Sequence, residues 1–156
     1  MKNKNEIKIK YLVLWLADSC NLNCKYCYAH PNFTNKFMNF EIAKKAIDLY
    51  ADKNFTLILA GGEPFLNTQV AIQLAERVRK EFGNEKDIWV YSGYTYEQLL
   101  RSSEDKKKLL DLCDVLVDGP FMIFLKDLSL RFRGSSNQRI IDIKKSTIDN
   151  VVLYLD

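Results

Sequence analysis

Short apolar runs alternate with amphipathic stretches along most of the chain. Continuous apolar character predicts strands buried on both faces at residues 11–16, 56–60, 88–91 and 115–117. Spacing of apolar residues near the helical period predicts helices between these runs, at residues 40–50, 69–82, 95–100 and 105–112. Asn39 and Thr95 are suitable N-caps, and Gly83 lies just past the end of the helix predicted at residues 69–82. Two final strands are expected at residues 139–143 and 151–155.

This alternation predicts an α/β fold with a mainly parallel sheet and right-handed crossovers. About six strands are too few for a complete eight-stranded barrel. We therefore expect a partial, open β/α barrel that forms a single domain over residues 1–156. In such folds the loops after the carboxyl ends of the strands carry the chemistry. Unusual sequence follows each of the first four strands: a cysteine-rich loop, Gly61-Gly62-Glu63-Pro64, Ser92-Gly93 and Asp118-Gly119-Pro120.

Composition narrows the class of protein. Apolar residues make up 47% of the chain and charged residues 28%, as in an ordinary globular protein, and the net charge of +3 gives no indication of a nucleic-acid partner. No apolar run approaches the roughly 18 residues that span a bilayer, and the first run continues into polar sequence without a signal-peptidase site. We expect a cytoplasmic protein. Thiols stay reduced there, so its four cysteines indicate metal binding rather than disulfides.

Three of these cysteines, Cys20, Cys24 and Cys27, lie within eight positions. A tight loop of thiolates suits a four-iron cluster, and three ligands for four irons leave one coordination site open. Two alternatives compete: a structural zinc site completed by His30, and three buried thiols that act as small hydrophobic residues. No paired ligands return from a distant segment to complete a zinc site, and the neighbouring residues are polar. Cys113 lies in an apolar helix-to-strand junction, where we expect a core residue; His30 is expected to orient the loop or face solvent.

The segment from Cys20 to Cys27 resembles the CxxxCxxC loop of radical S-adenosylmethionine enzymes, with Tyr26 at that family's aromatic position. Gly61-Gly62-Glu63-Pro64 is similar to the family's GGEP motif, although such a tetrapeptide alone also forms a plain turn. The resemblance implies a [4Fe-4S] cluster on the three cysteines, with S-adenosyl-L-methionine on the open iron.

The same resemblance implies roles around that cofactor. Gly61 and Gly62 would let the backbone approach its amino group, and Glu63 would offer that group an acceptor. Tyr26 would lie against the adenine or only exclude water. Ser92 would reach the ribose or only stabilise a turn.

A narrower resemblance covers residues 92–99, 115–121 and 130–139, which are similar to activating proteins of anaerobic ribonucleotide reductase. It implies reductive cleavage of S-adenosylmethionine to a 5′-deoxyadenosyl radical, which removes hydrogen from a glycine of a partner glycyl-radical enzyme. A one-electron donor such as flavodoxin or ferredoxin would supply the electron. Such activators usually carry a longer lead before the first strand. The sequence flanking the cysteine loop is closer to general radical enzymes, including those that modify peptides.

Other functions are compatible with these residues. The chain could act directly on a peptide or small molecule, or be a non-enzymatic metal-binding module. A loop bearing Lys126, Arg131, Arg133 and Arg139 is either a docking surface for the partner or an ordinary solvated loop. Asp118 either lines the site or caps the following turn.

Overall fold

The computed structural model describes residues 10–18, 36–50 and 55–154. Within these ranges a strand comes first and helices separate most of the strands that follow. The elements in chain order are β1 (Tyr11–Trp15), α1 (Phe40–Leu49), β2 (Thr56–Ala60), the 3₁₀-helix η2 (Pro64–Leu66), α2 (Thr68–Phe82), β3 (Ile88–Tyr91), α3 (Tyr96–Leu100), α4 (Glu104–Leu112), β4 (Val115–Asp118), the 3₁₀-helix η3 (Ile123–Leu125) and β5 (Arg139–Asp142).

The strands form one sheet with the order β1-β2-β3-β4-β5. The first four are parallel, with Leu59 paired to Val90, while β5 runs antiparallel to β4, with Leu116 paired to Ile141. The predicted α/β class and mainly parallel sheet are therefore confirmed. Among the strands that the structure describes, β1 and β5 are the outermost.

The expected sixth strand, at residues 151–155, is wrong for the four residues that the structure describes there. Leu153 makes only an isolated antiparallel bridge to Ile141. Two backbone hydrogen bonds reach the segment: Tyr154 N donates to Ile140 O at 2.7 Å, and Asp142 N donates to Val152 O at 2.9 Å. The apolar pattern that predicted a strand instead serves packing, because the Tyr154 ring lies 5.3 Å from that of Trp89.

The helix ends follow the local sequence. The Asn39 side chain accepts a hydrogen bond of 2.7 Å from Glu41 N and caps α1. Thr95 and Gln98 form a reciprocal capping box at the start of α3. Helix α2 ends at Gly83, which has a φ of +56°. These three predicted helix boundaries are confirmed.

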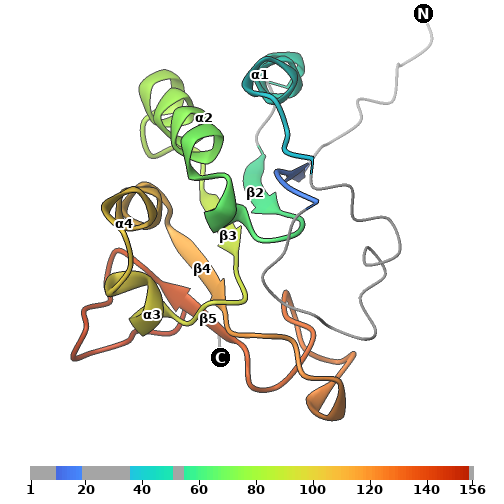
Figure 1. The fold of residues 1–156 in the computed structure, drawn as a ribbon, viewed down its shortest axis with the longest axis vertical. Coiled ribbons are helices and arrows are strands. Elements are labelled where there is room, and N and C mark those ends of the chain that lie inside the picture. Colours follow the sequence, from blue (N-terminus) through green and yellow to red (C-terminus); the bar gives the residue numbers. More distant parts are fainter. Residues whose placement is uncertain (1–9, 19–35, 51–54, 155–156) are drawn as a thin grey trace, which may run out of the picture.

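Helices α1, α2 and α4 cover one face of the sheet (Figure 1). Alternate strand residues such as Leu57 and Leu59 point into the core beneath them. The opposite face carries a smaller cluster made of Ile58, Trp89, Val115, Val117 and Ile140. Phe132, from the long segment between β4 and β5, packs against this second cluster. The segment thus covers part of the face that the helices leave open.

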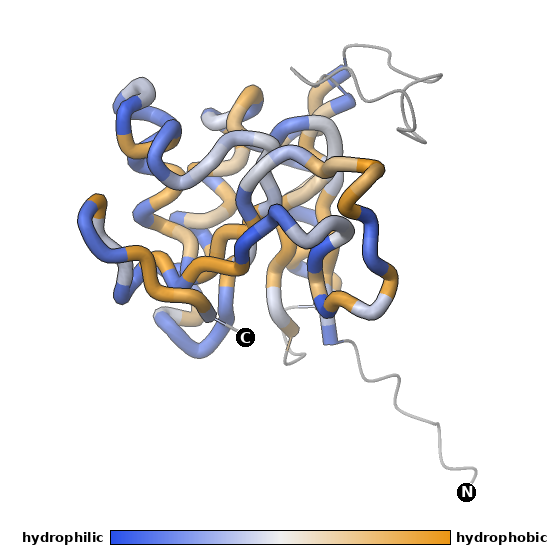
Figure 2. The backbone as a smooth tube through the Cα atoms, turned by 90° about the horizontal axis from the view of Figure 1, so that it is seen from below, coloured by the Kyte–Doolittle hydropathy of each residue, from blue (hydrophilic) through white to orange (hydrophobic). Residues whose placement is uncertain are grey.

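The segment between β4 and β5 lies away from the three covering helices (orange in Figure 1). Figure 2 views the molecule from that side and shows hydrophobic stretches interrupted by hydrophilic ones along the outer tube.

None of the helices in the described ranges has the length and apolar character that a membrane crossing requires.

Candidate active site at the carboxyl edge of the sheet

The carboxyl ends of β2, β3 and β4 surround a cavity of about 160 Å³. Parallel strands place the loops that follow them at one edge, so residues far apart in sequence meet there. The cavity is lined by Gly61, Gly62, Tyr91, Ser92, Gly93, Gly119, Phe121 and Gln138. Three of the predicted site residues, Gly61, Gly62 and Ser92, are therefore brought together.

The segment that carries the three clustered cysteines begins and ends at this same edge. Leu16 N, just after β1, donates to Ala60 O at 2.9 Å, and Asp18 N donates to Lys36 O at 2.8 Å. Ala17 and Phe37 form an antiparallel bridge. Residues 18 and 36 are thus joined directly, and the 17 intervening residues leave from and return to one point beside the end of β2.

Cys20, Cys24, Tyr26, Cys27 and His30 lie outside the described residues, so their predicted roles rest on the sequence. In the described ranges no three His, Cys, Asp or Glu side chains are grouped as metal ligands would be. Cys113 is fully buried, and burial raises the pKa of its thiol to about 12. The prediction that Cys113 belongs to the core is confirmed.

Gly61 fits the site because its backbone lies directly against Trp15. It has a φ of +80°, and a Cβ added there would lie 2.2 Å from the indole ring. Gly62 also has a positive φ, of +55°. Side chains at these positions would be strained by the backbone, and at Gly61 would also clash. The two glycines therefore provide a bare stretch of backbone along the cavity.

Glu63 is fully buried behind that backbone and ties two loops together. Its Oε1 accepts hydrogen bonds from Phe65 N at 3.2 Å and from Ser92 Oγ at 3.0 Å. Its Oε2 accepts one from Gly93 N at 2.8 Å. Burial raises the pKa of Glu63, and these three hydrogen bonds oppose part of that rise. The structure thus places the predicted residues Glu63 and Ser92 in direct contact.

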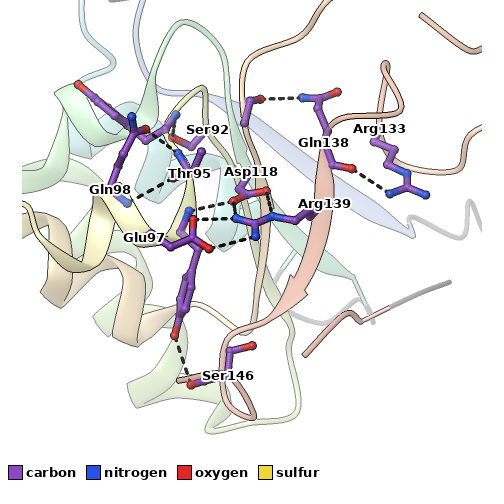
Figure 3. Close-up of polar contacts among 12 residues, drawn as sticks. Ser92, Thr95, Glu97, Gln98, Asp118, Arg133, Gln138, Arg139 and Ser146 are labelled. Atoms are coloured by element: carbon purple, nitrogen blue, oxygen red, sulfur yellow. Dashed lines mark hydrogen bonds and ion pairs between the residues drawn. The ribbon is translucent and has the colours of Figure 1, made fainter. Parts of the chain in front are cut away.

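Asp118, at the end of β4, is held by a network that the sequence did not reveal (Figure 3). Arg139 Nε donates to Asp118 Oδ1 at 3.0 Å, and its two terminal nitrogens donate to Glu97 at 3.0 and 2.9 Å. Tyr96 N donates to Asp118 Oδ2 at 2.8 Å. Asp118 therefore accepts from the first backbone N–H of α3 and pairs with Arg139, and it is absent from the cavity lining.

The same network corrects one expectation about Arg139. Its guanidinium joins β5 to β4 and α3, so it belongs to an internal ion-pair network rather than to a docking surface. The bidentate contact lowers the pKa of Glu97 to about 2. The pKa of Arg139 is raised in turn by Asp118 and Glu97.

Gln138 is one of the cavity residues that sequence reasoning missed, together with Tyr91 and Phe121. Its Nε2 donates to Gly119 O at 3.1 Å, and its Oε1 accepts from Gly134 N at 2.9 Å and Ser135 N at 3.2 Å. Figure 3 shows it between the end of β4 and the return to β5. Gln138 lies within residues 130–139, one of the segments that carry the resemblance noted above, but only the fold shows that its amide fixes the cavity wall.

Comparison with known proteins defines the class. The family model described as "4Fe-4S single cluster domain" matches residues 10–141. That range includes every strand of the sheet up to the middle of β5, together with the three clustered cysteines.

Several curated relatives share one name. An "Anaerobic ribonucleoside-triphosphate reductase-activating protein" of Vibrio cholerae is 34% identical over 132 residues, which are 80% of this chain and 83% of the relative. Proteins of the same name from Haemophilus influenzae and Salmonella typhimurium are 33% and 40% identical over 133 residues, covering 80% and 78% of this chain and 83% and 82% of the relatives. The chain therefore belongs to the family of anaerobic ribonucleoside-triphosphate reductase-activating proteins. No solved structure matches it.

Proposed function

We propose that the chain is a radical S-adenosylmethionine activase for an anaerobic ribonucleotide reductase. The observation that carries this proposal is that the two described ends of the cysteine-bearing segment lie at the edge of the sheet that holds the Gly61-Gly62 cavity. Asp18 and Lys36 close the base of that segment beside Ala60, the residue before Gly61. A cluster held by Cys20, Cys24 and Cys27 would then lie within reach of a cofactor bound along the glycine backbone.

The donor set fits such a cluster. Thiolates are the ligands that iron–sulfur clusters use, and the only described cysteine, Cys113, is buried in the core and cannot serve as a fourth. When bound, the reduced cluster supplies the electron that cleaves S-adenosyl-L-methionine to methionine and a 5′-deoxyadenosyl radical. The remaining tasks fall to this chain's own residues, which bind the cofactor, orient it and exclude water.

Gly61 and Gly62 offer backbone to the methionine portion of the cofactor, and Ser92 faces the same cavity. Glu63 Oε2 accepts one described hydrogen bond, from Gly93 N, whereas a carboxylate oxygen accepts two. It therefore has capacity for a second donor, which would stabilise a carboxylate that burial otherwise disfavours. Glu63 is fully buried and does not line the cavity, so the proposed contact with the cofactor's amino group requires the loop after β2 or β3 to move on binding. Tyr26, on the cluster loop, completes the proposed set by covering the adenine.

The proposal extends to fold, partner and location. The parallel order of β1 to β4 supports an open β/α barrel of the radical S-adenosylmethionine type. The names of the relatives support an anaerobic ribonucleoside-triphosphate reductase as partner. The proposed electron source is a one-electron donor such as flavodoxin or ferredoxin. A thiol-ligated cluster favours the reducing cytoplasm.

The test is an electron paramagnetic resonance measurement. The chain is reconstituted anaerobically with iron and sulfide, then mixed with the anaerobic reductase of the same organism, S-adenosylmethionine and dithionite. We expect the doublet of a glycyl radical on the reductase, dependent on every component. Formation of 5′-deoxyadenosine without any radical on the reductase would contradict the assignment of the partner.

A further inference from the structure

Three large apolar side chains are exposed within six residues of the segment between β4 and β5. Ile123 is 50% exposed, Phe124 79% and Leu128 87%. We call these three residues the apolar tip. Exposed apolar residues scattered singly are normal, but a local group of this kind marks an interaction site.

The apolar tip projects from a base that is held in one shape. Lys126 and Ser135 form an antiparallel bridge, Ser136 N donates to Leu125 O at 2.9 Å, and Asp127 N donates to Gly134 O at 3.2 Å. The buried hydroxyl of Ser135 accepts a hydrogen bond of 3.1 Å from Met122 N. A surface fixed before binding loses little conformational entropy when a partner docks on it.

The base of the tip is also the wall of the cavity. Phe121, two residues before Ile123, and Gln138 both line it. Gly134 lies against the Phe121 ring so closely that a Cβ there would be 2.7 Å from it. The cavity of about 160 Å³ is smaller than a typical ligand pocket and cannot admit a folded domain. A partner protein that presents a glycine to a cofactor bound there must therefore rest on the surface outside, beside the tip.

The charges around the tip indicate the kind of surface that it fits. Lys126 and Arg131 are exposed on either side of Leu128. The intervening carboxylate of Asp127 accepts hydrogen bonds from Ser129 N at 2.8 Å and from Ser129 Oγ at 2.6 Å, and so serves a local turn. Arg133 is directed inward, where it donates to Gln138 O at 2.8 Å. With one exposed carboxylate, Asp127, against Lys126 and Arg131, the net charge beside the tip is positive.

We propose that the apolar tip is the docking site for the glycyl-radical partner enzyme, which would receive Phe124 and Leu128 in an apolar pocket bordered by acidic residues. The proposal rests on the proposed function for the identity of the partner. It assigns to three residues the contact that holds the partner while its glycine segment reaches the mouth of the cavity.

The test compares the double variant Phe124→Asp/Leu128→Asp with wild type. Leu49→Asp is the matched control: Leu49 is 74% exposed and ends α1, shortly before β2 begins and thus at the amino edge of the sheet. Binding to the anaerobic reductase of the same organism is measured by anaerobic calorimetry without reductant, so that no turnover is needed. Each variant is also assayed alone for 5′-deoxyadenosine formation, and analytical ultracentrifugation reports self-association.

The double variant is expected to raise the Kd for the reductase about tenfold or more, as loss of central interface residues does. Its formation of 5′-deoxyadenosine without reductase should stay within about twofold of wild type, and Leu49→Asp should match wild type in both measurements. An unchanged Kd in the double variant overturns the inference. Failure of the wild-type chain to bind the reductase also overturns the inference. The same holds if the wild-type chain self-associates and the double variant does not. Failure of the proposed function has a separate sign, the absence of 5′-deoxyadenosine in wild type, and the binding result stands regardless of it.

Discussion

The hydroxyl of Ser92 donates a hydrogen bond of 3.0 Å to the carboxylate of Glu63, across 29 positions of sequence. This contact joins the loop after β2 to the loop after β3, and Gly93 N strengthens it from the same loop. Two residues predicted separately to contact a cofactor therefore form one buried unit behind the cavity. Changes at either residue should affect both the stability of the edge and the binding of the cofactor.

Replacing Glu63 with Gln should lower the free energy of unfolding by about 1–3 kcal/mol. The carboxylate uses one oxygen to accept from Phe65 N and Ser92 Oγ and the other to accept from Gly93 N. An amide has only one oxygen, so at least one of these buried donors is left without a partner. Urea titration measures the loss. The exposed Glu85→Gln is the control and should change stability by less than about 0.5 kcal/mol. Equal stability of the two variants would show that the Glu63 contacts contribute little.

The same Glu63→Gln variant should bind S-adenosylmethionine more weakly, because the amide nitrogen that replaces one carboxylate oxygen repels an amino donor. Equilibrium dialysis with the reconstituted protein measures this. If the variant binds the cofactor as wild type does, Glu63 has only a structural role.

Gly61→Ala should destabilise the chain more than Gly83→Ala does. Both glycines have positive φ, so both variants incur backbone strain, but only at Gly61 does an added Cβ meet another group, the Trp15 ring at 2.2 Å. The difference between the two variants is expected to be about 1–3 kcal/mol, the usual cost of overpacking. Thermal and urea unfolding measure both. Equal losses would mean that Trp15 moves aside without cost.

Glu97 should make stability sensitive to acid. Its pKa is lowered from 4.5 to about 2 by Arg139, so the folded state favours the charged form. This contribution is fully present above the unfolded pKa of 4.5 and is lost as the pH falls towards 2. Unfolding free energies of wild type and Glu97→Gln, measured from pH 6 downward, should therefore converge on acidification. A constant difference across that range would contradict the role of the ion pair.

Cys113→Ala should keep the full iron and sulfide content, because this thiol is buried in the core and its pKa is raised to about 12. The variant should lose only about 1 kcal/mol of stability. Cys27→Ala, by contrast, should lose the cluster. Iron and acid-labile sulfide analysis after reconstitution distinguishes the two. Loss of the cluster in Cys113→Ala would identify Cys113 as a ligand.

Apolar runs and capping residues, which can be recognised within a few positions of sequence, predicted most of the strands and helix ends correctly. The parallel strands from β1 to β4 and the caps at Asn39 and Thr95 were all evident from apolar runs and hydrogen-bonding side chains. The same reasoning was wrong for residues 151–154, since an apolar segment packs on Trp89 as readily as it pairs in a sheet.

Long-range polar contacts could not be predicted in this way. Arg139 and Glu97 are separated by 42 positions, and nothing in either local sequence indicates the other. Arg139 therefore looked like part of a basic surface loop. Gln138 likewise gained its role only because β5 returns antiparallel to β4, a direction that apolar periodicity does not specify.

The most direct test of the central claim is an anaerobic assay for 5′-deoxyadenosine. The reconstituted chain is given dithionite and S-adenosylmethionine, with Cys27→Ala treated identically as the control. The account predicts 5′-deoxyadenosine and methionine from wild type and neither product from Cys27→Ala. A wild-type protein that binds zinc without sulfide and forms no 5′-deoxyadenosine would contradict it.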